Sequence, residues 1–113
     1  ILNPMKETSL FINFMGDSPM VRVFDYLITE GELDFSITDM AENAGIGRST
    51  LYRIWDQLTE NKIILHTRDI GKAKLFKLNT NDPTMKKIVR LHWEILKAET
   101  NKHLSKREIE IEA

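Results

Sequence analysis

The stretch that decides the fold spans residues 36–64 and reads SITDMAENAGIGRSTLYRIWDQLTENKII. Apolar residues recur at helical spacing from Ile37 to Ala44, and Gly45 follows them, where it can take the left-handed conformation that turns the chain sharply. A longer helical pattern then opens at Gly47. Two helices joined by so tight a turn form a helix-turn-helix, and we expect this motif here.

The second helix of this motif is predicted to begin at Gly47 or Arg48 and to end near Asn61, a residue that tolerates a left-handed conformation. Its pattern is amphipathic, and the apolar side consists of Leu51, Ile54, Trp55 and Leu58. The opposite side carries Arg48, Ser49, Tyr52, Arg53 and Asp56.

This polar side has the chemistry that a DNA duplex requires. The major groove admits one helix and presents hydrogen-bonding base edges, with phosphates on both flanks. Free backbone amides and the partial positive charge at the start of a helix also favour phosphate. We therefore predict DNA contacts at Arg48, Ser49, Thr50, Tyr52 and Arg53, with Ser49 and Thr50 on phosphate. The alternative is a core helix whose solvated side merely happens to be basic.

A short β-hairpin is predicted directly after this helix. The segments IILHTRD and KLFKLN read as strands, with the turn at residues 70–72. Because a lone strand pair is only marginally stable, its apolar side must lie on the helices. The connector at residues 32–35 is expected to add a minimal strand to this hairpin.

The net charge of −1 hides an uneven distribution along the chain. Residues 1–45 hold two basic and eight acidic residues, a net charge of −6. Residues 46–77 hold seven basic and three acidic residues, a net charge of +4, and residues 78–113 come to +1. The positive charge therefore sits on the second helix and the hairpin, where a phosphate backbone would lie.

With these features in place, residues 17–80 resemble the winged helix-turn-helix transcriptional regulators, in particular the small MarR, ArsR and TrmB-like regulators of archaea and bacteria. The resemblance is carried by ITDMAENAGIGRSTLYRIWDQLTENKII and the following HTRDIGKAKLFKL. It implies a mainly α fold with a small β wing, and a homodimeric repressor that binds specific double-stranded DNA sequences. It also implies wing contacts at Arg68, Lys72 and Lys74, which the short wing favours on phosphate rather than inside the minor groove.

Additional helices are expected on both sides of this core, within a single domain spanning 1–113. Asn3-Pro4 is a good helix start, so the first helix is predicted within residues 1–15. A second begins at Ser18-Pro19. The last is predicted over 82–103, followed by a frayed tail at 104–113.

The first and last helices carry more apolar surface than one core contact needs, which indicates dimerisation. The residues predicted at the dimer interface are Leu10, Phe11, Phe14, Met15, Ile88, Leu91, His92 and Ile95. The alternative is that all of them pack within their own chain.

Several other classes of protein are disfavoured. The chain has no cysteine, and no apolar run approaches the roughly 20 residues that cross a bilayer, so we expect a soluble cytoplasmic protein without membrane contact. Without a glycine-rich phosphate loop or clustered carboxylates, neither enzymatic activity nor a cofactor is predicted. No residue pattern identifies a small-molecule effector. The competing class is a winged helix that serves as a protein-interaction module in a transcription-related complex.

A metal site is also disfavoured. Some regulators of the ArsR type bind zinc through histidines spaced like His92 and His103, which have ten residues between them. Arg90 and Lys106 stand where the two remaining ligands of such a site would be, and cations repel a metal ion. We therefore predict no metal.

Overall fold

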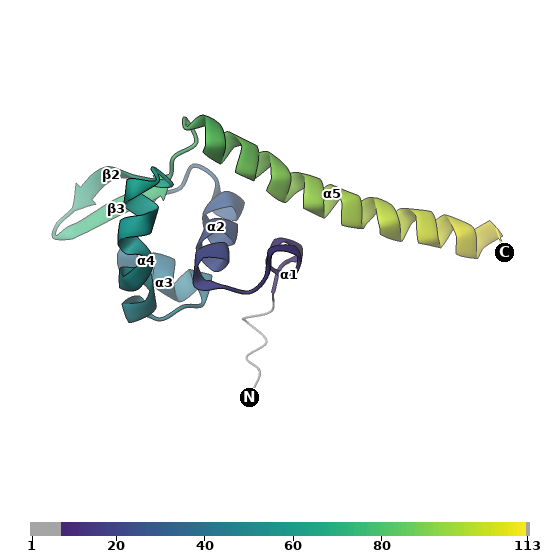
Figure 1. Ribbon diagram of the computed structural model, residues 1–113, viewed down its shortest axis with the longest axis horizontal. Coiled ribbons are helices and arrows are strands. Elements are labelled where there is room, and N and C mark those ends of the chain that lie inside the picture. Colours follow the sequence, from purple (N-terminus) through teal and green to yellow (C-terminus); the bar gives the residue numbers. More distant parts are fainter. Residues whose placement is uncertain (1–7, 113) are drawn as a thin grey trace.

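Helices make up most of the computed structural model, which describes residues 8–112 and their side chains as far as Lys102 (Figure 1). The elements follow one another as α1 (Leu10–Met15), α2 (Pro19–Glu30), β1 (Phe35–Ser36), α3 (Ile37–Ala44), α4 (Arg48–Glu60), β2 (Ile64–Ile70), β3 (Ala73–Leu78) and α5 (Pro83–Glu112). The predicted mainly α fold with a small β wing is confirmed.

Local signals define both ends of α3 and the start of α4. The Ser36 hydroxyl accepts a hydrogen bond from the Asp39 amide at 3.1 Å and caps α3. Gly45 follows in the left-handed conformation, with φ 75° and ψ 33°, which a residue without Cβ adopts at little cost. The chain then re-enters helix at Arg48. The predicted helix-turn-helix is confirmed.

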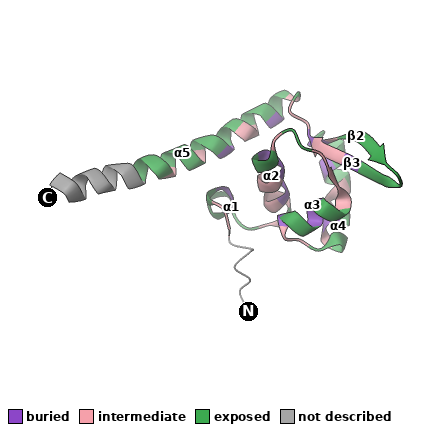
Figure 2. Ribbon diagram, turned by 180° about the vertical axis from the view of Figure 1, so that it is seen from behind, coloured by how far each residue is buried: buried purple, intermediate pink, exposed green. Residues whose placement is uncertain are grey.

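The core lies between α2, α3, α4 and the sheet (Figure 2). Its fully buried large side chains are Val23, Leu27, Met40, Leu51, Leu58 and Leu78. Leu51 and Leu58 lie two turns apart on one side of α4, so their burial fixes the rotation of that helix. The opposite side of α4 consequently faces solvent.

The three strands form one antiparallel sheet in the order β1-β3-β2. Phe35 pairs with Phe76, which confirms the minimal strand expected from the connector. Between β2 and β3, Ile70 pairs with Ala73, so Gly71 and Lys72 alone make the turn. Gly71 has φ 60°, and glycine at this position is typical of a tight hairpin turn whose twist suits antiparallel strands.

The end of α4 differs from the prediction. The residue in the left-handed conformation is Lys62, with φ 56°, whereas Asn61 has φ −86°. The Asn61 side-chain amide instead donates a 2.9 Å hydrogen bond to the carbonyl oxygen of Gln57. The Asn61 side chain therefore adds a second hydrogen bond to a carbonyl that already accepts one from the Asn61 backbone amide, and the strained backbone position moves one residue further along.

Helix α1 starts later than predicted. The Ser9 hydroxyl accepts a hydrogen bond from the Ile12 amide at 3.2 Å, and the helix begins at Leu10. The predicted start at Asn3-Pro4 lies outside the described residues. Helix α1 is therefore a short segment that packs against α5, where the ring centroids of Phe11 and His92 are 4.9 Å apart.

Helix α5 begins as predicted and continues further. The Asp82 carboxylate accepts hydrogen bonds from the amides of Thr84 and Met85 at 3.0 and 3.1 Å, so it caps the helix. The helix reaches Glu112, beyond the predicted end at residue 103; fraying of its tail in solution stays a prediction. Thirty residues span about 45 Å, and α5 projects from the core (Figure 1). No helix in the described part of the chain is long and apolar enough to span a membrane.

Candidate nucleic-acid interface

The predicted recognition residues lie together on the solvent side of α4. Arg48, Ser49, Tyr52 and Arg53 are exposed, and Thr50 is half-buried at the first turn. Tyr52 keeps 52% of its surface accessible although it is a large aromatic residue. The packing of Leu51 and Leu58 into the core explains this orientation.

Arg48 and Tyr52 are one helical turn apart and contact each other. A terminal guanidinium nitrogen of Arg48 donates to the Tyr52 hydroxyl at 3.4 Å, and the guanidinium carbon lies 6.0 Å from the ring centroid. Such a contact restricts both side chains while leaving most of their hydrogen-bonding groups open to solvent. The pair therefore presents a guanidinium and a phenol in a defined arrangement at the start of α4.

The amino-terminal end of α4 has no side-chain cap. Gly47 occupies the N-cap position with φ −72° and ψ 153°, and no side chain accepts a hydrogen bond from the first-turn amides. A Cβ added at Gly47 would lie 3.8 Å from Thr50 Oγ1 and 3.9 Å from Ser49 Oγ, an ordinary van der Waals separation. The open helix end is thus a ready site for an anion, and phosphate suits it.

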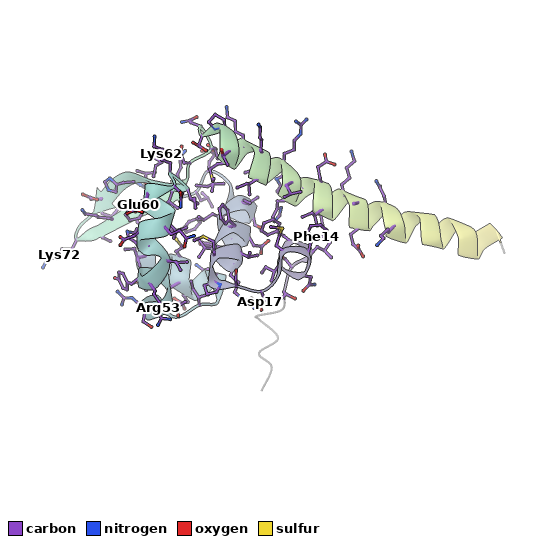
Figure 3. The ribbon with its side chains drawn as sticks, viewed as in Figure 1. Phe14, Asp17, Arg53, Glu60, Lys62 and Lys72 are labelled. Carbon is purple, nitrogen blue, oxygen red and sulfur yellow. The ribbon has the colours of Figure 1, made fainter. Side chains whose placement is uncertain are left out.

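The wing adds positive charge beside this helix. Lys72 is in the hairpin turn and Lys74 is in β3, and both are exposed. Figure 3 shows Arg53 on α4 and Lys72 at the hairpin tip, both on the side of the molecule away from the projecting part of α5. Within the described part of the chain, no ion pair involves Arg48, Arg53, Lys72 or Lys74.

Two other cations of the basic segment are neutralised. The Arg68 guanidinium contacts the Asp34 carboxylate at 3.0 and 3.2 Å, and Lys77 Nζ lies 2.6 Å from Glu32. The Arg68 guanidinium and the Thr67 hydroxyl hold the pKa of Asp34 below its usual value. Of the three predicted wing contacts, the structure therefore leaves Lys72 and Lys74 unpaired and places Arg68 in an ion pair.

Sequence reasoning did not identify Asp34 as part of this surface. Asp34 lies 34 positions before Arg68, in a connector counted only toward the acidic part of the chain. The signal that could have found it is the expected pairing of the connector with the hairpin, because that pairing brings the acidic connector to the basic wing.

Six of the eight predicted dimer-interface residues are exposed or half-buried, and the other two are buried. Leu10, Phe14, Met15 and Leu91 are exposed, with Phe14 at 69%, while Ile88 and Ile95 are half-buried. Phe11 and His92 are only 4% and 7% exposed because they pack against each other and His92 Nε2 lies 2.9 Å from Asp25 Oδ1. For these two residues the interface assignment is corrected: they belong to the contact of α1 and α2 with α5 inside the chain.

A hollow of about 420 Å³ lies between α1 and α5. It is lined by Phe14, Glu94, Ile95, Ala98, Glu99 and Lys102. Phe14 of α1 borders this hollow, and the α5 side of it carries the apolar Ile95 and Ala98 among charged residues. Among the described residues, no cluster of three or more histidine, aspartate or glutamate side chains could hold a metal ion.

Comparison with known proteins identifies the fold. No family model and no curated protein matches this sequence. The solved structure of a ZitR double mutant from Lactococcus lactis in its apo form superposes with a TM-score of 0.60 at 17% identity, over 74% of this chain and 66% of that one. A single mutant of ZitR has also been solved in complex with DNA, and that structure matches with a TM-score of 0.54 at 18% identity, over 71% of this chain and 57% of that one.

Two further structures are similar. The antimony-specific transcriptional repressor AntR matches with a TM-score of 0.57 at 15% identity, over 81% of this chain and 78% of that one. Sso10a-2, a DNA-binding protein from Sulfolobus solfataricus, matches with a TM-score of 0.51 at 21% identity, over 82% of this chain and 93% of that one. The chain therefore has the winged helix-turn-helix fold that such DNA-binding regulators share.

Proposed function

We propose that this protein is a transcriptional regulator that binds specific double-stranded DNA sequences, acting in the cytoplasm as a homodimeric repressor. One observation carries the proposal: the solvent side of α4 combines an uncapped amino-terminal end with Arg48, Tyr52 and Arg53, next to wing lysines that form no ion pair with any described residue. In this proposal the protein binds DNA and performs no catalysis.

The geometry of α4 assigns a role to each group. Arg48, Tyr52 and Arg53 meet the base edges of the major groove, where an arginine can contact guanine O6 and N7 together. The first-turn amides, Ser49 and Thr50 bind the phosphate that flanks the groove. In this arrangement the base contacts select the sequence and the phosphate contacts hold the helix in register.

The wing and the outer helices complete the proposal. Lys72 and Lys74 contact phosphates beside the groove, since the turn between β2 and β3 is too short for a deep insertion. The exposed apolar residues of α1 and α5 join two copies about a two-fold axis, which places two recognition helices about 34 Å apart on a pseudo-palindrome. AntR is a transcriptional repressor with this fold, which supports repression as the mode of action.

Fluorescence anisotropy of labelled duplexes tests DNA binding. The duplexes are selected from a random pool by the native protein and compared with scrambled sequence over a salt series. We expect the affinity to fall steeply with salt, and Arg53→Ala to weaken the selected duplex about 10-fold while reducing discrimination against scrambled DNA.

The matched control is Arg90→Ala. Arg90 is an exposed arginine on α5, so its loss removes the same charge away from α4 and should change the affinity less than about 2-fold. Affinity that is independent of salt, or equal losses in the Arg53 and Arg90 variants, would contradict the proposal. The first result would favour the protein-interaction module, and the second would place the DNA contact away from α4.

A further inference from the structure

Asp34 links the connector before β1 to the far strand of the wing. Its carboxylate accepts a hydrogen bond from Thr67 Oγ1 at 2.6 Å and two from Arg68, one from Nε at 3.0 Å and one from a terminal nitrogen at 3.2 Å. Both partners lie on β2, whereas Asp34 lies beside β1 at the other edge of the sheet. One half-buried carboxylate therefore bridges the sheet from edge to edge.

Thr67 marks an irregularity in the wing. The pairing of β2 with β3 shifts between His66 and Arg68, so Thr67 has no backbone register partner on β3, although its hydroxyl also lies 3.2 Å from the carbonyl oxygen of Leu75. Such a bulge bends a strand and increases its twist, so it sets the direction in which the outer hairpin points. The hydrogen bond from Thr67 to Asp34 ties this bend to the connector.

Arg68 is held at one side and open at the other. Its side chain is 62% exposed although Asp34 accepts hydrogen bonds from two of its nitrogens. A guanidinium has more N–H groups than one carboxylate can occupy, and the remainder point into solvent. An arginine that is already restrained also loses less conformational freedom when it binds a phosphate.

We propose that Asp34 is a positioning residue for DNA binding, which holds Arg68 and the outer wing in the orientation that meets a phosphate. This inference rests on the proposed DNA-binding function. A carboxylate near DNA repels phosphate, so charge alone predicts that removing it strengthens DNA binding. The inference predicts the opposite, that removing the Asp34 carboxylate weakens DNA binding.

The test uses Asp34→Asn with Glu32→Gln as its matched control. Glu32 lies in the same connector and contacts Lys77 and Thr80, so Glu32→Gln removes the same charge without touching β2. We expect Asp34→Asn to weaken binding to the selected duplex about 5-fold, and Glu32→Gln to leave it unchanged or slightly stronger. Melting temperatures of both variants establish that they are folded.

A double-mutant cycle separates positioning from general damage. Arg68→Ala should weaken binding and reduce the salt slope by about 0.9, the value of one phosphate contact. In the Arg68→Ala background, Asp34→Asn should weaken binding much less than in the native protein, because only its hydrogen bond with Thr67 and its charge remain to act. Arg68→Lys, which keeps the charge but loses the paired geometry, should resemble Asp34→Asn and carries the test if Asp34→Asn does not fold.

Three outcomes overturn the inference. One is an Asp34→Asn variant that binds as well as the native protein or better; another is an equal loss in both backgrounds of the cycle. Native-like binding by Arg68→Ala alongside weak binding by Arg53→Ala would also reject the role of Asp34 while the proposed function stands. If no variant changes the DNA affinity and the affinity of the native protein does not change with salt concentration, the proposed function itself is wrong.

Discussion

At Gly47, a substitution that stabilises the helix is expected to weaken DNA binding. Aspartate, asparagine and serine cap helices better than glycine because their side chains accept a hydrogen bond from a first-turn amide. Nothing near Gly47 excludes a side chain, and its backbone conformation suits any residue. The amides left uncapped by Gly47 are the groups that we propose bind phosphate, so a better cap would compete with DNA.

We expect Gly47→Asp to raise stability and lower DNA affinity together. A carboxylate at the N-cap stabilises the helix by about 0.5 kcal/mol, which is a rise of roughly 2–4 °C in melting temperature for a domain of this size. The same carboxylate occupies and repels the phosphate position, so affinity should fall about 10-fold or more. Calorimetry and anisotropy measure the two effects.

The matched control for this change is Gly47→Asn, which caps the helix without a charge. It should give a similar gain in melting temperature with a smaller loss of affinity. Unchanged DNA binding in the Gly47→Asp variant would place the phosphate elsewhere.

At the scale of elements, the link between α4 and β2 holds a strained residue. Lys62 has φ 56°, a conformation that costs a residue with a Cβ about 1 kcal/mol or more. The chain accepts this cost because Ile63 and Ile64, directly after it, are buried in the core. The carbonyl oxygen of Lys62 also accepts a 3.1 Å hydrogen bond from the Asn79 side chain.

Lys62→Gly should therefore raise the free energy of unfolding by about 1 kcal/mol, because glycine adopts positive φ without strain. The neighbouring Asn61→Gly is the control. Asn61 has negative φ, and its substitution removes the side-chain hydrogen bond to the Gln57 carbonyl, so this variant should be less stable than the native protein. Urea denaturation followed by circular dichroism measures both. A destabilised Lys62→Gly variant would show that contacts of the lysine side chain outweigh the strain.

At the scale of the whole molecule, the two candidate surfaces lie apart. The labelled Arg53 and Lys72 are on one side of the view and Phe14 is toward α5 (Figure 3). An interface at α1 and α5 would consequently leave α4 and the wing free. This separation is what a protein needs if each of two joined copies contacts its own half-site.

Phe14→Glu tests the interface on which dimerisation depends. Phe14 is 69% exposed and borders the hollow beside α5, so a charge there should shift a dimer to monomer without disturbing the core. Light scattering at micromolar concentration should give the mass of two chains for the native protein and of one for the variant. Leu33→Glu is the control, because Leu33 is an exposed apolar residue in the connector between α2 and β1 and should leave the mass unchanged.

A monomeric native protein in that measurement would contradict the homodimer. The expected consequence for DNA follows from symmetry. Phe14→Glu should lose most of the affinity for a duplex with two half-sites, and it should retain the affinity of the native protein for a single half-site.

The sequence by itself determined the order and type of the elements from α2 to the start of α5, and the polar side of α4. These features follow from local rules, in which Ser36 and Asp82 cap helices, Gly45 and Gly71 permit turns, and apolar spacing selects one side of each helix. The notable failure is Lys62, where a strained backbone was expected at Asn61. Packing of the following strand decides that position, and no local pattern reports it.

Only the tertiary structure decided which apolar and charged side chains remain free. Phe11 and His92 bury each other, although a helical pattern alone cannot distinguish a core contact from an interface. Arg68 forms an ion pair with Asp34, which lies 34 positions earlier in the sequence, whereas Lys72 and Lys74 stay unpaired within the described chain. The physical reason is that burial and ion pairing depend on distances in space, which folding sets between residues that are remote along the chain.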